Sequence, residues 1–129
     1  FAAGLDHAGA EVFGVELDRE AAANARVNVP RGRFLALSLA KALRRLPSGV
    51  DLVVLDPPRR GAGAAVVARV ADLAPRAVAY VACDPASLAR DLAGFAVRGY
   101  EAERIRAFDL FPMTHHVECV AILKPATRT

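Results

Sequence analysis

The side chain best suited to chemistry is Cys83, which directly follows an apolar run from Ala77 to Ala82. Asp84 and Pro85 end that run, and an amphipathic segment begins near Ser87. This order predicts a buried strand, a tight turn and a helix, with Cys83 at the carboxyl edge of a sheet beside a helix N-terminus. That position favours the thiolate, the nucleophilic form of cysteine. Free cysteines are often buried and inert, so a structural role for Cys83 stays open.

Two carboxylates also end predicted strands. Glu16 closes the first strand, where an acid can accept hydrogen bonds from both hydroxyls of a ribose, although it could also be a solvated acid beside Asp18. Asp56 is followed by Pro57 and Pro58, whose fixed φ angles make the loop rigid. Such a loop can hold a carboxylate against a cofactor or a planar base, or it can simply end the strand.

The last predicted strand contains a third carboxylate, Glu118, which becomes a candidate only if the strand order brings it near Cys83. His115 and His116 precede it, but adjacent strand residues point to opposite faces and a cysteine-rich ligand set is lacking. We therefore expect no metal site. Cys119 lies mid-strand among apolar residues and is predicted to belong to the core.

The elements that must position these residues alternate along the chain. Strands are predicted at residues 9–16, 33–38, 50–56, 77–82, 101–110 and 117–123, and helices at 1–7, 19–27, 39–46, 64–73 and 87–97. This alternation predicts an α/β fold with a mostly parallel, doubly wound sheet. The short loop at residues 111–116 predicts an antiparallel hairpin at its end.

Length and composition narrow the class of protein. The chain has 129 residues, of which 24% are charged and 54% hydrophobic, as expected for one globular domain. No apolar run reaches the roughly 18–20 residues that a membrane-spanning helix needs. The net charge of +3 fits a polyanionic partner without requiring one. Two cysteines cannot form a disulfide framework and suit the reducing cytoplasm.

Three segments together resemble one family of enzymes. LDPPRRGAG, YVACDPASLARDLA and FPMTHHVECVAIL resemble the RNA uracil-5-methyltransferases that use S-adenosylmethionine, in the same order and with similar spacing. The resemblance extends over nearly the whole chain, from GAEVFGVELD onward. It implies a Rossmann-like methyltransferase fold, S-adenosylmethionine as cofactor, and a uridine of ribosomal or transfer RNA as substrate.

The resemblance also implies roles for individual residues. Cys83 would be the nucleophile and Glu118 the general base, while Glu16 and Asp56 would lie in the cofactor site. Ser38 stands where family members usually carry an acid that faces the adenine, so it is a further cofactor-site candidate.

The glycine-rich turn that opens such a fold has no match before Gly9. We therefore expect residues 1–129 to be the C-terminal part of a catalytic domain that depends on an upstream segment of the same protein. The sheet should have an unfilled slot between Gly14–Glu16 and Val53–Leu55, which predicts that the isolated chain is unstable and binds S-adenosylmethionine weakly.

Two other classes of function stay open. One is a methyltransferase that acts on an exocyclic amine, in which the acid-Pro-Pro loop would hold the base and Cys83 would be structural. The other is a non-catalytic remnant of the fold or an RNA-binding module. Cofactor binding separates a remnant from an enzyme, and covalent trapping of RNA that contains 5-fluorouracil separates the two enzymes.

Overall fold

The computed structural model describes residues 1–114 and 116–127. These residues form two compact units, Phe1–Pro47 and Ser48–Thr129. No helix in the described part of the chain is long and apolar enough to cross a membrane.

The first unit contains a two-stranded parallel sheet and short helices. Its elements are α1 (Ala2–His7), β1 (Phe13–Glu16), α2 (Arg19–Asn28), β2 (Arg33–Ala36), α3 (Leu39–Ala42) and the 3-10 helix η1 (Leu43–Arg45). The two strands pair from Phe13 opposite Arg33 to Glu16 opposite Ala36, so their carboxyl ends coincide. The single helix predicted at residues 39–46 is thus two short pieces.

The start of α2 follows directly from its sequence. One carboxylate oxygen of Asp18 accepts hydrogen bonds from the backbone N–H groups of Glu20 and Ala21, at 2.8 and 2.9 Å. These bonds satisfy donors that would otherwise be unpaired in the first turn. Asp18 is therefore the N-cap of α2. Ala22 and Val29 are buried and anchor the helix in this unit.

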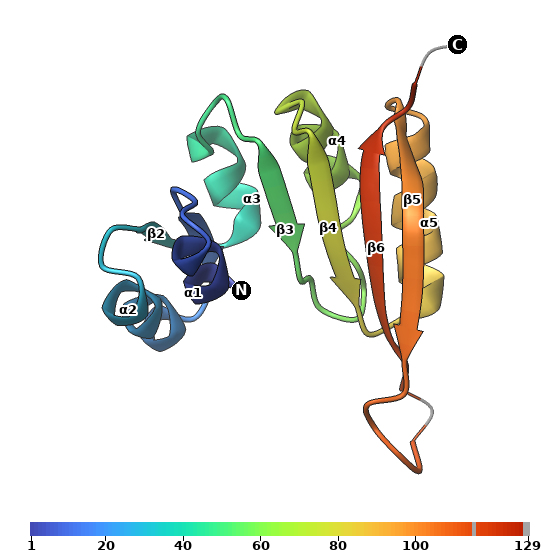
Figure 1. The fold of residues 1–129 in the computed structure, drawn as a ribbon, viewed down its shortest axis with the longest axis horizontal. Helices are drawn as coiled ribbons and strands as arrows, with labels where there is room; N and C mark the ends of the chain where they lie inside the picture. Colours follow the sequence, from blue (N-terminus) through green and yellow to red (C-terminus); the bar gives the residue numbers. More distant parts are fainter. Residues whose placement is uncertain (115, 128–129) are drawn as a thin grey trace. The chain divides into compact units, whose positions relative to one another are not determined.

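The second unit is a four-stranded mixed sheet with two helices on one face (Figure 1). Its elements are β3 (Leu52–Leu55), α4 (Ala64–Asp72), β4 (Ala77–Ala82), α5 (Pro85–Ala96), β5 (Tyr100–Phe108) and β6 (Glu118–Pro125). The strand order is β3-β4-β6-β5, in which β3 and β4 are parallel and the other neighbours antiparallel. The predicted antiparallel hairpin of β5 and β6 is confirmed.

Alternating burial in β4 and β6 defines the core of the second unit. Val78, Tyr80 and Ala82 are buried, and each lies opposite a buried residue of β6. One of these is Cys119, which lies opposite Ala82 and is 6% exposed, as the prediction of a core position required. Burial raises the pKa of the Cys119 thiol, and the nearby charge of Glu118 raises it further.

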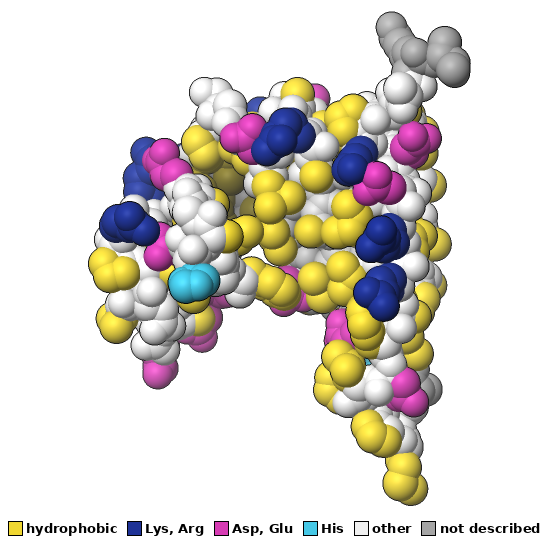
Figure 2. All heavy atoms as spheres, viewed as in Figure 1, with side chains coloured by type: hydrophobic (Ala, Val, Ile, Leu, Met, Phe, Trp, Pro, Cys, Tyr) yellow, Lys and Arg dark blue, Asp and Glu magenta, His cyan; other side chains and the backbone are white. Residues whose placement is uncertain are grey.

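The other face of this sheet carries no helix of the second unit. Figure 2 shows hydrophobic side chains gathered on this face over β3, β4 and β6. The residues that alternate with the buried ones are half-buried here, such as Val81 and its partner Val120. Arg106 pairs with Val120 and Arg104 with Ile122, so positive charge lines the β5 side of the apolar surface.

Two details differ from the predicted boundaries. Helix α5 begins at Pro85, two residues earlier than predicted, because proline suits the first helical position and Asp84 caps the helix. Strand β3 is shorter than the apolar run at residues 50–58 and ends at Leu55. Within the described residues β1 pairs with β2 and β3 with β4, so the strands expected to border the slot belong to separate sheets.

Candidate active site

The pairing of β4 with β6 brings Cys83 and Glu118 to the same edge of the sheet. Ala82 lies opposite Cys119 at the end of this antiparallel ladder, and Cys83 and Glu118 are the next residues outward from that pair. Residues directly opposite in such a ladder have Cα atoms about 4.5–5.5 Å apart and side chains on the same face. Both residues are half-buried, so neither side chain is closed off from a substrate. Glu118 therefore stays a candidate, because its role requires a strand order that pairs β6 with β4.

Asp56 reaches the same edge from the neighbouring parallel strand. Leu55 pairs with Tyr80, so Asp56 leaves β3 beside the last residues of β4, before Cys83. The Asp56 carboxylate is exposed, and the side chains of Asp56, Cys83 and Glu118 form no hydrogen bond or ion pair within residues 1–114 and 116–127. Three reactive groups thus converge on one edge without structural partners.

The turn after Cys83 is fixed by its own residues. One carboxylate oxygen of Asp84 accepts a hydrogen bond from the backbone N–H of Ser87 at 2.8 Å and so caps α5. Hydrogen bonding by Ser87 lowers the pKa of Asp84, and the guanidinium groups of Arg59 and Arg90 lower it further. The carboxylate form of Asp84 therefore holds the backbone next to the thiol.

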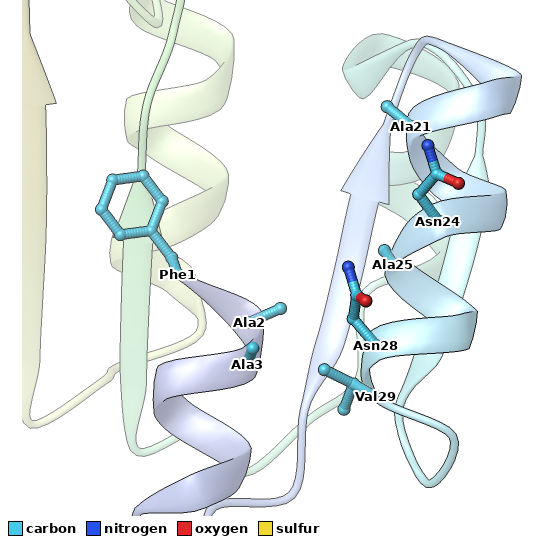
Figure 3. A pocket seen from close by; sticks show the side chains of 8 residues that line it. All are labelled: Phe1, Ala2, Ala3, Ala21, Asn24, Ala25, Asn28 and Val29. Carbon is cyan, nitrogen blue, oxygen red and sulfur yellow. The ribbon is translucent and has the colours of Figure 1, made fainter.

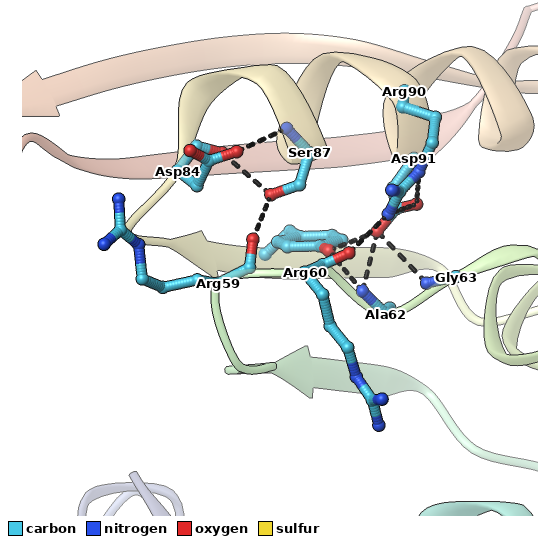
Figure 4. A network of polar contacts seen from close by, with 9 residues as sticks. Arg59, Arg60, Ala62, Gly63, Asp84, Ser87, Arg90 and Asp91 are labelled. Atoms are coloured by element: carbon cyan, nitrogen blue, oxygen red, sulfur yellow. Dashed lines mark hydrogen bonds and ion pairs between the residues drawn. The ribbon is translucent and has the colours of Figure 1, made fainter.

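A polar network ties the loop after Asp56 to α5 (Figure 4). The Ser87 hydroxyl donates to the backbone carbonyl of Arg59 at 2.8 Å. The buried carboxylate of Asp91 accepts hydrogen bonds from the hydroxyl of Tyr80 at 2.6 Å and the backbone N–H of Ala62 at 2.7 Å. The loop is thus held at several points, most of them through its backbone.

Our sequence reasoning missed this network, although one signal for it was present. Ser87, Asp91 and Phe95 are spaced four apart and lie on the buried face of α5. A carboxylate on the apolar face of a helix requires partners, because burying an unpaired charge is strongly unfavourable. The sequence could have flagged Asp91 on this ground, but not the loop to which it binds.

In the first unit, Glu16 and Ser38 lie at the carboxyl end of the two-stranded sheet. Glu16 is the last residue of β1 and pairs with Ala36, two residues before Ser38. Glu16 is exposed, and its Oε1 accepts a hydrogen bond from the Asp18 backbone N–H at 3.1 Å. Ser38 precedes α3, yet its hydroxyl makes no capping hydrogen bond. A carboxylate and a hydroxyl with spare hydrogen-bonding capacity suit the hydroxyls and base of a nucleoside.

A shallow depression between α1 and α2 in the first unit is a weaker candidate (Figure 3). It is lined by Phe1, Ala2, Ala3, Ala21, Asn24, Ala25, Asn28 and Val29. None of these side chains is acidic, basic or nucleophilic, so the depression offers no group for acid–base or covalent chemistry.

In residues 1–114 and 116–127, no three His, Cys, Asp or Glu side chains gather closely enough to hold a metal ion. His115 lies outside the described residues. The ring of its neighbour His116 packs edge-on against Phe111, with ring centroids 6.3 Å apart.

Comparison with known proteins assigns the chain to a family. A family model described as tRNA (uracil-5-)-methyltransferase matches residues 36–126. The chain belongs to this family. An uncharacterized RNA methyltransferase of Streptomyces avermitilis is 50% identical over 121 residues, covering 91% of this chain and 28% of that protein. A Thermotoga maritima relative of the same description is 37% identical and covers 92% of this chain and 28% of its own length.

Solved structures give the same assignment to the uracil-5-methyltransferase family. The tRNA (uracil-54, C5)-methyltransferase of Pyrococcus abyssi, solved with S-adenosyl-L-homocysteine, has a TM-score of 0.78 and 35% identity, over 95% of this chain and 30% of that one. A methyltransferase structure from Thermoplasma acidophilum, at 11% identity and a TM-score of 0.65, shares the fold. The predicted Rossmann-like methyltransferase fold is thus confirmed. The chain spans less than a third of the relatives and of the Pyrococcus abyssi protein.

Proposed function

We propose that the protein containing this chain transfers a methyl group from S-adenosylmethionine to carbon 5 of a uridine in RNA. Membership of the uracil-5-methyltransferase family supports the reaction class. The single observation that carries the proposal is the pairing of Ala82 with Cys119, which supports a position for Cys83 and Glu118 one residue outward, at the same edge of the sheet. This pair supplies the two groups that methylation of carbon 5 requires.

Cys83 is the proposed nucleophile because carbon 5 of uracil attacks electrophiles poorly. Addition of the Cys83 thiolate to carbon 6 forms a carbon–sulfur bond and moves the ring electrons toward oxygen 4, which makes carbon 5 an enolate carbon. That carbon then takes the methyl group from the sulfonium of S-adenosylmethionine. The cysteine stays bound to carbon 6 until carbon 5 loses its hydrogen.

Glu118 is the proposed base for that last step. Its carboxylate removes the proton from carbon 5, the electrons re-form the carbon 5–carbon 6 double bond, and the Cys83 thiolate leaves. The base must lie on the same side of the sheet as the nucleophile, and the ladder register supports this arrangement. The products are 5-methyluridine, S-adenosyl-L-homocysteine and the free thiolate, and Glu118 passes its proton to water before another cycle.

The cofactor is proposed to contact Asp56, Glu16 and Ser38. Asp56 is an exposed carboxylate on a loop held in place at the edge that carries Cys83, so it can accept hydrogen bonds or face positive charge. Glu16 and Ser38 offer acceptors for ribose hydroxyls and for the base. S-adenosylmethionine, when bound, supplies the methyl group as a good electrophile.

The substrate is proposed to be a uridine in ribosomal or transfer RNA. The target base must leave its stack to reach the thiol. Other enzymes that modify bases in nucleic acids also require the base to be flipped out in this way. Basic side chains on the β5 side of the sheet and a net charge of +3 favour a polyanion. An unbridged cysteine at position 83 also suits the reducing cytoplasm, where we place the protein.

The test uses the full-length protein, because this chain is less than a third of its relatives' length. Transfer RNA and ribosomal RNA transcripts are incubated with S-adenosylmethionine, and nucleosides are identified by mass spectrometry. We expect 5-methyluridine in one of these RNAs and release of tritium from uridine labelled at carbon 5. Methyl groups found only on exocyclic amines would contradict the proposal. Failure to bind S-adenosylmethionine in a calorimeter would instead indicate a non-catalytic remnant.

A further inference from the structure

Asp91 has an environment that the proposed reaction does not yet use. This residue of α5 is only 2% exposed, yet it carries a charge. Its Oδ2 accepts hydrogen bonds from the Tyr80 hydroxyl at 2.6 Å and from the backbone N–H groups of Ala62 and Gly63 at 2.7 and 3.3 Å. Burial alone would raise the pKa of Asp91, but hydrogen bonds from Tyr80, Arg90 and these two N–H groups outweigh it, and the pKa is lowered. One carboxylate therefore joins β4, α5 and the loop after β3.

Two further bonds tie the same loop to the same helix. The Ser87 hydroxyl donates to the carbonyl of Arg59 at 2.8 Å, and the Arg90 guanidinium donates to the carbonyl of Arg60 at 2.7 Å. Because both acceptors are backbone atoms, the bonds fix the course of the loop and leave the side chains of Arg59 and Arg60 exposed (Figure 4).

Gly61 makes this close approach possible. Its φ is +80°, and a Cβ built there would lie 2.5 Å from the Arg90 guanidinium and 2.6 Å from the Asp91 carboxylate. Any larger residue would therefore push the loop away from α5 and strain the backbone. The loop is shaped to fit against Arg90 and Asp91.

The bonded loop and the proposed nucleophile share the same supports. Tyr80 lies three residues before Cys83 on β4, and its hydroxyl also accepts a hydrogen bond from the N–H of Ala62 at 2.9 Å. On the other side of Cys83, Asp84 caps α5 through Ser87, which also holds Arg59. A shift of the loop relative to α5 would thus change the position of its first residue, Asp56, relative to Cys83.

We propose that Asp91 and Tyr80 are positioning residues, which hold the 56–63 loop so that Asp56 stays aligned with Cys83 for methyl transfer. The inference rests on the proposed function and adds residues that touch neither substrate nor cofactor. A rigid support matters here because small displacements of reacting groups reduce rates strongly.

The test compares Asp91→Asn and Tyr80→Phe with the control Asp72→Asn, all in the full-length protein. Asp72 is an exposed carboxylate at the end of α4, so its substitution removes a charge without touching the network. The first readout is hydrogen exchange at the amides of Ala62 and Gly63. We expect exchange at these amides to be about tenfold faster in Asp91→Asn and unchanged in the control.

The second readout separates positioning from simple stabilisation. We expect Asp91→Asn to weaken S-adenosylmethionine binding by about tenfold and to lower kcat by about ten- to a hundredfold, because Asp56 is misplaced. The rate at which iodoacetamide alkylates Cys83 should stay within about twofold, since the strand end itself is intact. Faster amide exchange with unchanged cofactor affinity and kcat would overturn the inference, as would unchanged exchange.

Two further variants keep the result interpretable. Tyr80→Phe removes only a hydroxyl and should show the same pattern with smaller changes, so it decides the matter if Asp91→Asn does not fold. Gly61→Ala adds a methyl group on the loop itself, which would collide with Arg90 and Asp91 and displace the loop. This variant should reproduce the loss of cofactor affinity while Asp91 is intact. Because exchange and cofactor binding need no RNA, they can support the inference even if no uridine is methylated and the proposed function fails.

Discussion

The two ends of the four-stranded sheet differ in whether their polar side chains have partners. At the end where β3 and β4 begin, charges pair with one another: Arg76 bonds Asp51 at 3.1 Å and Lys124 bonds Glu103 at 2.8 Å. At the end where these strands finish, Asp56, Cys83 and Glu118 have no such partner in the described chain.

Contacts that hold the backbone in place are distributed the other way round between the two ends of the sheet. The loop between β3 and α4 is held by Asp91, Ser87 and Arg90, two of which are buried. The salt bridges at the other end are solvent-exposed, with both side chains of the Arg76–Asp51 pair at least 75% accessible. At the end that carries Cys83, the buried polar contacts therefore fix the loop after β3, while the side chains of Asp56, Cys83 and Glu118 stay unpaired among the described residues. A preorganised site needs this combination of a rigid support and available reactive groups.

The substitution expected to have the largest effect on the end with the reactive groups is Cys83→Ala in the full-length protein. Methyl transfer should fall by at least about 10³-fold, because no other group can add to carbon 6. The covalent complex with RNA containing 5-fluorouridine, seen as a shifted band on a denaturing gel, should disappear. Cys119→Ala is the matched control and should keep both, because Cys119 is buried on the other face. A covalent complex formed by Cys83→Ala would rule out the nucleophile assignment.

Glu118→Gln should have the next largest effect. Addition and methylation should still occur, but release should slow by about 10²–10⁴-fold because the proton at carbon 5 has no base. A methylated RNA–protein adduct should therefore accumulate and be detectable by mass spectrometry after digestion. Glu103→Gln, at the opposite end of the sheet, should turn over normally. Normal turnover by Glu118→Gln would show that another group acts as the base.

Much of the site could be predicted because its signals are local in the sequence. The apolar run before Cys83 is bounded by Pro75 and Asp84, so β4 was predicted at Ala77–Ala82, as observed. The acid-Pro-Pro sequence marked the end of β3 within one residue, since two prolines cannot continue a ladder. These features depend on neighbours in the chain and need no tertiary information.

The remainder depends on contacts between distant residues. Nothing near Glu118 indicates that β6 inserts between β4 and β5, because strand order depends on how hydrophobic faces pack together. Similarly, Asp91 and Ala62 are 29 residues apart, so their hydrogen bond has no local pattern. The start of α5 was placed late because Asp84 and Pro85 were interpreted as a turn and not as a helix cap.

Stability should also distinguish the two ends. Asp91→Ala leaves the Tyr80 hydroxyl proton and the Gly63 N–H without their acceptor and removes one of the two acceptors of the Ala62 N–H, so the free energy of unfolding should fall by about 2–4 kcal/mol. Asp51→Ala removes an exposed salt bridge and should lower it by less than about 1 kcal/mol. Urea unfolding followed by circular dichroism measures both. Equal losses would mean that the network at the carboxyl end is no stronger than a surface ion pair.

The difference between wild type and Asp91→Asn should depend on pH. The folded pKa of Asp91 is below its ordinary value, so its ionised form stabilises the fold at pH values above the unfolded pKa of about 4. That stabilisation is lost as pH falls through the folded pKa. The gap in unfolding free energy should therefore be constant from pH 7 to 5 and shrink below pH 4. A gap that widened on acidification would contradict the sign of the shift.

The smallest effect is expected for the pair of Lys124 and Glu103, at the end without reactive groups. Both side chains are about half exposed, so solvent screens their attraction despite the short distance of 2.8 Å. A double-mutant cycle with Lys124→Met and Glu103→Gln should give a coupling free energy of about 0.2–1 kcal/mol, and 1 M salt should remove most of it. None of the three variants should change methyl transfer by more than about twofold. A coupling free energy above about 2 kcal/mol that persists in 1 M salt would mean that the Lys124–Glu103 end also contains a strong polar contact. The contrast between the two ends of the sheet would then depend on Cys83 and Glu118 alone.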